Sequence, residues 1–249
     1  MSRMRVAMFS LLSLLAVQAT PINLKSNNFA SIREPIDADS AGRLIHKLNS
    51  LTPTAVYLYI NSPGGSVLAG LEVINYIKGL QGSNRTIHCI ANNAMSMAFV
   101  ILQYCTTRYV QYGSTLMQHQ MSLSVEGSLA NVNSRMAYLN QISTELTTYQ
   151  AKRLDLSIQD FNQKVHNDWW LYSSDILKWK AADEITSVIC DFPNFEENVT
   201  HSTLFGEVYL TYSACPLIGH PLRISFGGSF NESQKQLYKD KMNNYFQKL

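Results

Sequence analysis

Two hydrophobic patterns alternate along residues 54–119, and this alternation constrains the fold more than any other feature of the chain. Residues 54–60 and 86–91 are rich in β-branched and aromatic side chains, which is typical of buried strands. Residues 66–80 carry apolar side chains at helical spacing, and residues 97–103 are mostly apolar. Strands that alternate with helices form a mostly parallel sheet, because parallel strands need crossover connections. We therefore expect an α/β fold with a mostly parallel sheet.

Further elements continue this pattern. Apolar side chains on one face predict a helix over residues 41–51, and residues 108–112 and 115–119 look like two short strands around a turn. Residues 128–154 predict a long amphipathic helix, which would extend about 40 Å at 1.5 Å per residue. Part of its apolar stripe could pack on another subunit, or all of it on its own sheet, and the sequence does not decide between them.

The rest of the chain is less regular. We expect residues 20–35 to be irregular, and a composition rich in Pro, Asn and glycosylation sequons begins at Asp191. The remaining expected elements are a helix over 158–166, a strand over 184–190, a hairpin from 208–212 and 222–226, and a helical, polar end over 232–249.

Length and composition set the domain organisation. The chain has 249 residues, of which 46% are hydrophobic, enough for one sizeable core. We expect a signal peptide over residues 1–19, one catalytic domain over 20–190 and a C-terminal appendage of unknown role over 191–249. Charged residues make up only 15% and the formal net charge is +2, which argues against nucleic acid as a partner.

The N-terminus has the pattern of a secretory signal. Arg3 and Arg5 precede a mostly apolar run over residues 6–17, and the small residues near Ala19 suit cleavage after it. The alternative is a membrane anchor, but the run is shorter than the roughly 20 residues that a spanning helix needs. We therefore expect a secreted or endomembrane-lumenal protein. Three glycosylation sequons give weak support and begin at Asn84, Asn198 and Asn231.

The four cysteines suit an oxidising compartment. We expect Cys190 and Cys215 to pair, because one precedes the appendage and the other lies in it. Cys89 lies in a predicted core strand and Cys105 follows a predicted helix, so we expect these two to be buried free thiols. No cysteine or histidine spacing matches a zinc site, and we expect neither a metal nor a cofactor.

A glycine pair follows the first predicted strand. Residues 61–65 read Asn-Ser-Pro-Gly-Gly, and Gly64 and Gly65 permit backbone angles that other residues avoid. Their N–H groups can point at a developing oxyanion. A phosphate-binding loop is the rival interpretation, but Gly70 is followed by Leu-Glu and not by Lys and Ser or Thr.

Two residues at predicted strand ends, and an aspartate further along the chain, supply groups that acyl transfer needs. Ser96 lies between a strand and a helix, His119 ends a strand, and Asp168 precedes two tryptophans. A serine before a helix is commonly an N-cap, but the small and apolar neighbours of Ser96 favour a buried turn. A carboxylate beside large apolar groups needs a partner, and an imidazole N–H would provide one. The order Ser-His-Asp differs from the orders of three common serine hydrolase classes, and no G-x-S-x-G elbow is present.

These motifs resemble the proteolytic subunit of the Clp protease, a serine peptidase family with the Clp/crotonase fold. Residues 57–65 are similar to its signature strand and glycine loop, residues 94–97 to its nucleophile turn and residues 117–120 to its histidine strand. The resemblance covers roughly residues 28–190. It implies repeated β-β-α units with a mostly parallel sheet and a long protruding helix, to which this chain adds an extra C-terminal segment.

The resemblance also implies roles for particular residues. Ser96 would attack the scissile carbonyl, His119 would act as general base and then general acid, and Asp168 would orient the imidazole. The N–H groups of Gly65 and Met97 would form the oxyanion hole. The implied activity is that of a serine endopeptidase on peptides or unfolded proteins. The family forms seven-membered rings stacked in pairs, so a homo-oligomer is expected, and a ring is possible.

Five positions depart from the family pattern. The family usually has glycine in place of Asn92 and Ala98, alanine in place of Met95, proline in place of Met121 and arginine in place of Asn167. That arginine takes part in contacts between rings. Together with the expected signal peptide, these changes argue against a Clp-type ATPase partner and favour a secreted peptidase that acts without one.

Two alternatives stay open at this stage. A catalytically inactive relative would keep the fold as an assembly or binding module, and the departures at Asn92, Met95 and Asn167 motivate it. An acyl-CoA enzyme of the crotonase type would share the fold and hold a thioester oxyanion on paired N–H groups. That chemistry has no need of Ser96 together with His119, and a secreted location lacks acyl-CoA.

Overall fold

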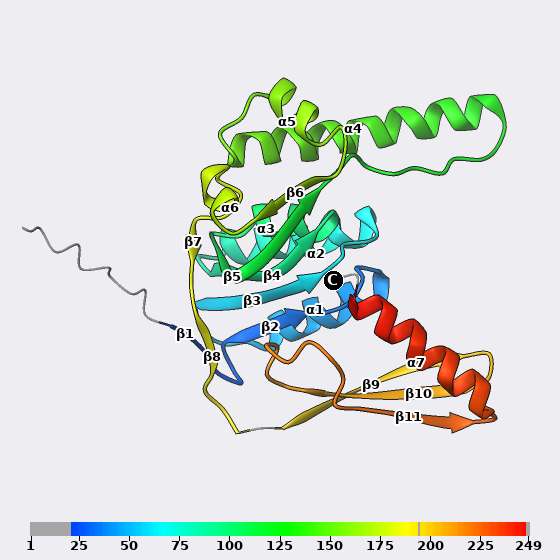
Figure 1. The fold of residues 1–249 in the computed structure, drawn as a ribbon. Helices are drawn as coiled ribbons and strands as arrows, with labels where there is room; N and C mark the ends of the chain where they lie inside the picture. The colour runs from blue at the N-terminus through cyan, green and yellow to red at the C-terminus, as the bar shows by residue number, and fades with distance from the viewer. Residues whose placement is uncertain (1–20, 194, 248–249) are drawn as a thin grey trace, which may run out of the picture.

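A parallel sheet forms the centre of the computed structural model, which describes residues 21–193 and 195–247 (Figure 1). The expected signal peptide lies outside these residues. Strands β2 to β5 run parallel in sequence order, β6 pairs with β5 in antiparallel orientation, and β7 adds a short parallel pair to β5. Their bounds are Phe29–Ile32, Ala55–Ser62, Thr86–Met95, Thr107–Gln118, Trp169–Tyr172 and Glu184–Ile185. The expected α/β fold with a mostly parallel sheet is confirmed.

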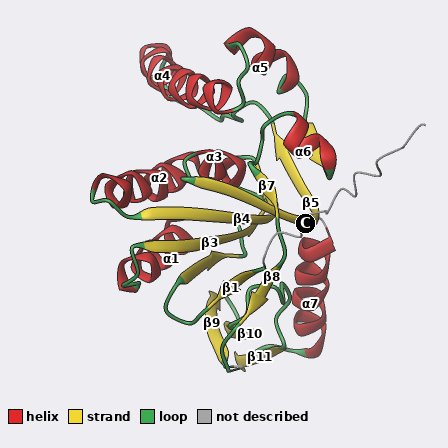
Figure 2. Ribbon diagram, turned by 90° about the vertical axis from the view of Figure 1, so that its left-hand side faces the viewer, coloured by secondary structure: helices red, strands yellow, loops and turns green. Residues whose placement is uncertain are grey.

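Three helices cover one face of this sheet (Figure 2). Their bounds are Ala38–Ser50 for α1, Val67–Gly82 for α2 and Met97–Gln103 for α3. Alternate residues of β3 face opposite sides, so Val56 and Leu58 join the core under the helices, while Tyr59 joins a smaller cluster on the other face. All seven residues of α3 are buried, which places the segment after Ser96 inside the molecule.

Strand β5 is longer than expected. Residues 108–112 and 115–119 were predicted as two strands around a turn, but the structure has one continuous strand with an irregular register beside Asn93. Gly113 takes a positive φ of 80°, and the Ser114 hydroxyl donates to the Ala91 carbonyl oxygen at 2.7 Å. The supposed turn is therefore a bulge that the sheet absorbs.

Two further expectations about strands were wrong. Within residues 20–35, the structure has strands β1 (Ile22–Leu24) and β2, where an irregular segment was expected. The strand expected over 184–190 is divided between β7, in the main sheet, and β8 (Val188–Cys190), which pairs with β1. These four strands are short, and pairing with distant strands, not a local pattern, defines them.

The expected long helix is α4 (Leu129–Arg153), which projects from the body (Figure 1). Its 25 residues extend about 37 Å, and its buried residues lie near its C-terminal end, at Leu146, Gln150 and Ala151. Helices α5 (Ile158–Lys164) and α6 (Ser174–Lys178) follow. Among the described residues, no helix has both the length and the hydropathy required to cross a membrane.

The C-terminal segment forms its own small unit. Strands β9 (Glu196–Thr203), β10 (Gly206–Ser213) and β11 (Arg223–Gly228) make an antiparallel sheet, and α7 (Glu232–Gln247) follows. The β10–β11 hairpin and the final helix were expected, whereas β9 was not, because its Glu, Asn and Thr residues lack a strand-like apolar pattern. Arg33 at the end of β2 joins this unit to the main sheet through the Ser213 carbonyl oxygen at 2.9 Å and the Glu197 carboxylate at 3.3 Å.

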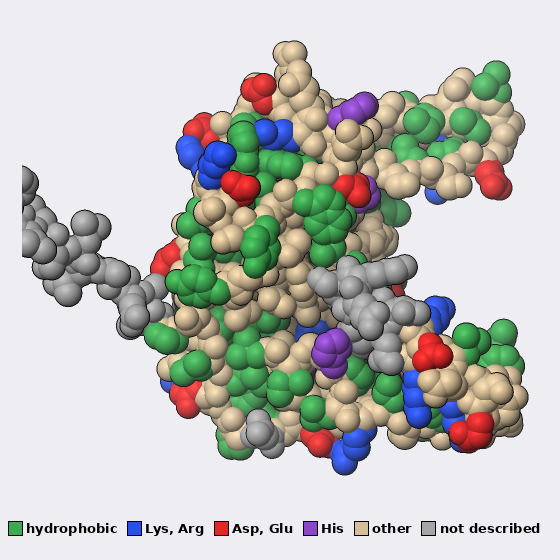
Figure 3. Space-filling model, viewed as in Figure 1, with side chains coloured by type: hydrophobic (Ala, Val, Ile, Leu, Met, Phe, Trp, Pro, Cys, Tyr) green, Lys and Arg blue, Asp and Glu red, His purple; other side chains and the backbone are tan. Residues whose placement is uncertain are grey.

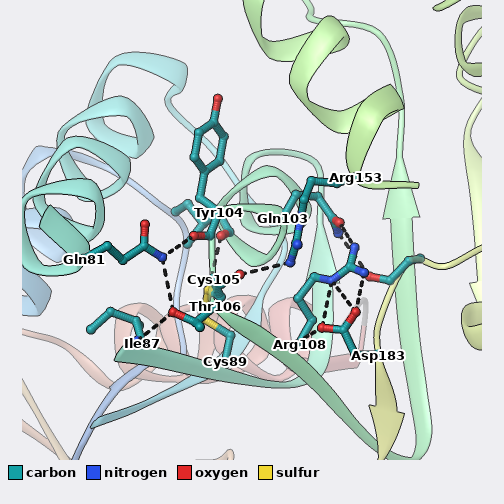
Figure 4. Close-up of a disulfide and its surroundings, with 12 residues drawn as sticks. Gln81, Ile87, Cys89, Gln103, Tyr104, Cys105, Thr106, Arg108, Arg153 and Asp183 are labelled. Atoms are coloured by element: carbon teal, nitrogen blue, oxygen red, sulfur yellow. Dashed lines mark hydrogen bonds and ion pairs between the residues drawn. A yellow bond between two sulfur atoms is a disulfide. The ribbon is translucent and has the colours of Figure 1, made fainter. Parts of the chain in front are cut away.

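Two disulfides are present in the structure. Cys190 pairs with Cys215, as expected, and this bond ties the end of β8 to the C-terminal unit. Cys89 and Cys105 were expected to be free thiols, but they are also bonded, with Cα atoms 5.8 Å apart (Figure 4). The expectation failed because the loop after α3 returns beside β4, an approach that sequence spacing does not reveal.

Candidate active site

Ser96 occupies a strained elbow between β4 and α3. Its φ is 52° and its ψ is −121°, a backbone region that non-glycine residues rarely adopt. The residue stands at the N-cap position of α3, yet its side chain makes no capping hydrogen bond. Its backbone N–H instead donates to the Met117 carbonyl oxygen at 2.8 Å. The hydroxyl is thus turned away from the helix end and is free for another partner.

That partner is His119. Its Nε2 lies 2.9 Å from the Ser96 Oγ, which is hydrogen-bond distance. The two residues meet because β4 and β5 are parallel and Met95 lies opposite Met117, so both strands end at the same edge of the sheet. The structure therefore brings together the hydroxyl and the imidazole that the sequence singled out.

Asp168 lies close to the same imidazole. Strands β5 and β6 pair with Gln118 opposite Trp169, and His119 and Asp168 are the residues that adjoin this last pair. The Asp168 Oδ1 lies 4.0 Å from the His119 Nδ1, beyond hydrogen-bond range. The Asp168 side chain is 57% exposed, and the imidazole suggested as its partner lies beside it without a hydrogen bond between them.

Of the glycine pair, Gly64 packs directly against the elbow and Gly65 packs against Ile36. A Cβ on Gly64 would lie 2.5 Å from the Met95 carbonyl oxygen and 2.8 Å from the Ser96 Cβ, and the φ of Gly64 is +87°. On Gly65 a Cβ would lie 2.3 Å from the Ile36 carbonyl oxygen. Both positions require glycine, because larger residues would strike the backbone of neighbouring segments.

The backbone around Gly65 leaves one N–H group available. Ile36 donates its N–H to the Gly64 carbonyl oxygen at 2.8 Å and accepts from the Ser66 N–H at 2.7 Å. In this bridge the N–H of Gly65 is not used. The Met97 N–H is the first in α3, where backbone N–H groups have no partner inside the helix. Both proposed oxyanion donors thus belong to segments that adjoin Ser96.

A cleft of about 900 Å³ opens beside these residues, between the end of the sheet and helices α4 and α5. The molecule is also hollowed between the projecting α4 and the C-terminal unit (Figure 3). The apolar residues that line the cleft are Val67, Met97, Val100, Met121, Leu123, Leu146, Ile158, Phe161 and Val165. Its other lining residues are serine, threonine, asparagine, glutamine and two histidines, so no aspartate, glutamate, lysine or arginine contributes.

Two glutamines of this cleft contact the site, and no role was predicted for either from the sequence. Gln118 and Gln150 are buried, and the backbone N–H of His119 donates to the Gln118 Oε1 at 3.1 Å. Nothing in the sequence signals this contact, because glutamine is common on protein surfaces. Among the described residues, no group of three or more His, Cys, Asp or Glu side chains could hold a metal ion.

Comparison with known proteins gives one consistent family. The family model for Clp protease matches residues 20–188. The chain is 28% identical over 162 residues to the ATP-dependent Clp protease proteolytic subunit 2 of Nocardia farcinica, a match that covers 61% of this chain and 77% of that protein.

Two more relatives extend the comparison. The proteolytic subunit of Borreliella afzelii is 26% identical over 52% of this chain and 66% of its own length. The proteolytic subunit 2 of Chlamydia trachomatis is 25% identical over 63% of this chain and 77% of its own length. The family model spans most of the chain, and this match supports a peptidase function. The chain belongs to the Clp protease family.

Proposed function

We propose that this protein is a serine endopeptidase that cleaves peptide bonds through an acyl-enzyme intermediate. The observation that carries the proposal is the 2.9 Å contact between the Ser96 Oγ and the His119 Nε2. A nucleophile within hydrogen-bond reach of a general base is the geometry that covalent hydrolysis needs. The strained backbone of Ser96 supports the same role, because strain of this kind concentrates at functional sites.

The proposed reaction has two stages. His119 accepts the Ser96 proton while the oxygen attacks the scissile carbonyl, and it then gives that proton to the departing amine. A water molecule, activated by the same imidazole, hydrolyses the ester. The N–H groups of Gly65 and Met97 are the proposed donors to the oxyanion, and losing one such donor costs about 3 kcal/mol, or roughly 100-fold in kcat.

Asp168 is the proposed partner of the imidazolium. When His119 gains a proton, its ring becomes a cation, and the carboxylate at 4.0 Å is attracted to it. The distance must shorten by roughly 1 Å for a hydrogen bond to form. Because the Asp168 side chain is exposed, a rotation about its own bonds meets little obstruction from the packed core.

The substrate proposed for this site is a peptide or an unfolded protein segment with uncharged side chains at the cleft. The lining combines apolar side chains with amide and hydroxyl groups and lacks acidic residues, lysine and arginine. A charged side chain would lose its water there without gaining an opposite charge. We expect peptides with apolar or amide side chains beside the scissile bond to be cleaved faster than peptides with charged ones.

The proposed setting is a secreted or lumenal protein that assembles with copies of itself and needs no Clp-type ATPase. The N-terminal signal pattern and the two disulfides support an oxidising compartment. The projecting part of α4 offers a surface for assembly, because its buried residues lie near its other end. Asn167, where the family usually has arginine, supports an assembly that differs from the stacked double ring.

A second candidate function is a catalytically inactive assembly module. The 4.0 Å gap between His119 and Asp168 favours it, because a triad without its aspartate contact lacks one of its three links. This candidate predicts oligomers in size-exclusion chromatography and no reaction with an active-site serine probe.

A fluorophosphonate probe separates the two candidates. We expect the purified protein to be labelled and Ser96→Ala to remain unlabelled while staying folded. Ser83→Ala, which removes an exposed hydroxyl at the end of α2, serves as the matched control and should label like the parent protein. A folded parent protein that takes up no probe would contradict the proposed peptidase.

A further inference from the structure

A chain of buried amide groups connects helix α4 to the backbone of His119. Gln118 is the last residue of β5 and is 5% exposed, and Gln150 on α4 is 3% exposed. The two side-chain amides are hydrogen-bonded to each other across the cleft wall. Burying an amide group costs free energy unless its donors and acceptors are paired. A buried pair of glutamines therefore calls for an explanation of what its hydrogen bonds hold in place.

Each hydrogen bond between these amide groups has a defined donor and acceptor. The Gln150 Nε2 donates to the Leu146 carbonyl oxygen at 3.0 Å, which leaves the Gln150 Oε1 as acceptor. The Gln118 Nε2 donates to that oxygen, which leaves the Gln118 Oε1 as acceptor for the backbone N–H of His119 at 3.1 Å. Reversing either amide would break contacts on both sides, so each contact fixes the next.

The hydrogen-bonded amides contact the backbone at the point where the pairing of β5 with β6 ends. His119 follows the last residue of β5, and the pairing with β6 ends at Gln118 and Trp169. Without a ladder partner, the N–H of His119 donates its hydrogen bond to a side-chain oxygen instead. The imidazole must stay within reach of the Ser96 hydroxyl, so the backbone from which it extends has to be fixed.

We propose that Gln118 and Gln150 are positioning residues that hold His119 for proton transfer. The inference rests on the proposed peptidase function and adds to it a connection that starts on α4, outside the triad. A displacement of about 1 Å from a residue that does not touch substrate can lower a rate by as much as 100-fold. Losing one amide contact should have a smaller effect.

The test measures the second-order rate of fluorophosphonate labelling together with the thermal midpoint. Gln118→Leu removes the acceptor for the His119 N–H, and Gln150→Leu removes the group that orients Gln118. We expect each variant to label roughly 10-fold more slowly and to unfold at a lower temperature, because each leaves a buried amide group unpaired. Gln81→Leu, which removes a glutamine from α2 away from the cleft, should label at the parent rate.

The double variant Gln118→Leu/Gln150→Leu decides the question. Replacing both partners with apolar groups of similar size removes the unpaired side-chain amides, so the thermal midpoint should recover toward that of the parent protein. The labelling rate should stay as low as in Gln118→Leu, because the His119 N–H still lacks its acceptor. A labelling rate that recovers with the thermal midpoint would show that the amides serve stability alone, and the proposal would be wrong.

Failure of this proposal is distinguishable from failure of the proposed function. If the parent protein is labelled at Ser96 and both single variants are labelled as fast as the parent protein, the positioning role is excluded and the peptidase assignment stands. If the parent protein is not labelled at all, the peptidase assignment fails, and the positioning role of the two glutamines falls with it.

Discussion

Ser96 and Ser173 have almost the same backbone but different surroundings. Each follows a strand and begins a short helix, with φ and ψ of 52° and −121° at Ser96 and 52° and −125° at Ser173. Neither side chain caps its helix. On local geometry alone, both are strained serine elbows.

The surroundings of the two serines separate them. The helix after Ser96 is buried throughout, Gly64 packs against the elbow, and His119 lies 2.9 Å from the hydroxyl. Ser173 is exposed, and only Ile176 is buried in the helix that follows it. Among the described residues, no histidine contacts the Ser173 hydroxyl.

The comparison teaches that a strained elbow does not by itself make a nucleophile. The reactive setting requires a general base at the adjacent strand end and a backbone that comes close enough to hold the oxyanion. Both come from segments distant in sequence. The following predictions test which of these surroundings matters most.

Removing the base should have the largest effect. We expect His119→Gln to lower kcat by about 10⁴-fold, because the hydroxyl loses its proton acceptor. His46→Gln on α1 replaces an exposed histidine remote from the cleft and should have little effect. Peptide hydrolysis measured at equal folded concentrations checks the pair, and comparable rates in the two variants would remove His119 from the mechanism.

Crowding the elbow should rank second. Gly64→Ala places a Cβ within 3 Å of Met95 and Ser96 atoms, so the elbow must shift, and we expect a loss of roughly 100-fold in labelling rate. Gly79→Ala in α2 meets nothing within 4 Å and should stabilise the protein by about 0.5–1 kcal/mol without a change in rate. Labelling kinetics and thermal unfolding of both variants measure the contrast. An unimpaired Gly64→Ala would mean that the tight contact is not required.

Asp168→Asn should have a smaller effect than His119→Gln. The carboxylate is exposed and 4.0 Å from the imidazole, so it stabilises the imidazolium less than a buried, bonded aspartate would. We expect kcat to fall by about 100-fold with little change in KM. Steady-state kinetics give both constants, and a loss as large as that of His119→Gln would indicate that the carboxylate closes fully onto the imidazole during the reaction.

The smallest effect is expected at the second elbow. Ser173→Ala removes an exposed hydroxyl to which no histidine is hydrogen-bonded within the described part of the chain, and labelling and hydrolysis should match those of the parent protein. Mass spectrometry of probe-labelled peptides would locate the modified serine. Modification at Ser173 would contradict the distinction drawn here between the two elbows.

The sequence predicted the regular elements of the parallel sheet well. Strand β3, helix α2 and helix α4 agree with the expected segments to within a few residues, because apolar periodicity is a local signal. Strands β1, β2 and β9 were missed, because pairing with other strands, and not a local apolar pattern, defines them. The bulge at Gly113 was taken for a turn, because a glycine beside a serine has the same local pattern in both.

In the candidate site too, local sequence patterns predicted some features, and contacts between distant segments decided the others. Ser96 and His119 were identified from their places at strand ends, and the structure brings them together. The exposure of Asp168, the bond between Cys89 and Cys105, and the pairing of Gln118 with Gln150 could not be predicted. Each depends on the distance between two segments after packing, and a difference of about 1 Å decides whether two groups form a hydrogen bond.

The sequence alone determined that a mostly parallel α/β sheet forms and that Ser96 and His119 stand at strand ends, because hydrophobic periodicity is a property of consecutive residues. Only the tertiary structure decided that Ser96 is the elbow with a base and that Ser173 is not. The physical reason is that strand register and close backbone approach, as at Gly64, are settled by packing between distant segments.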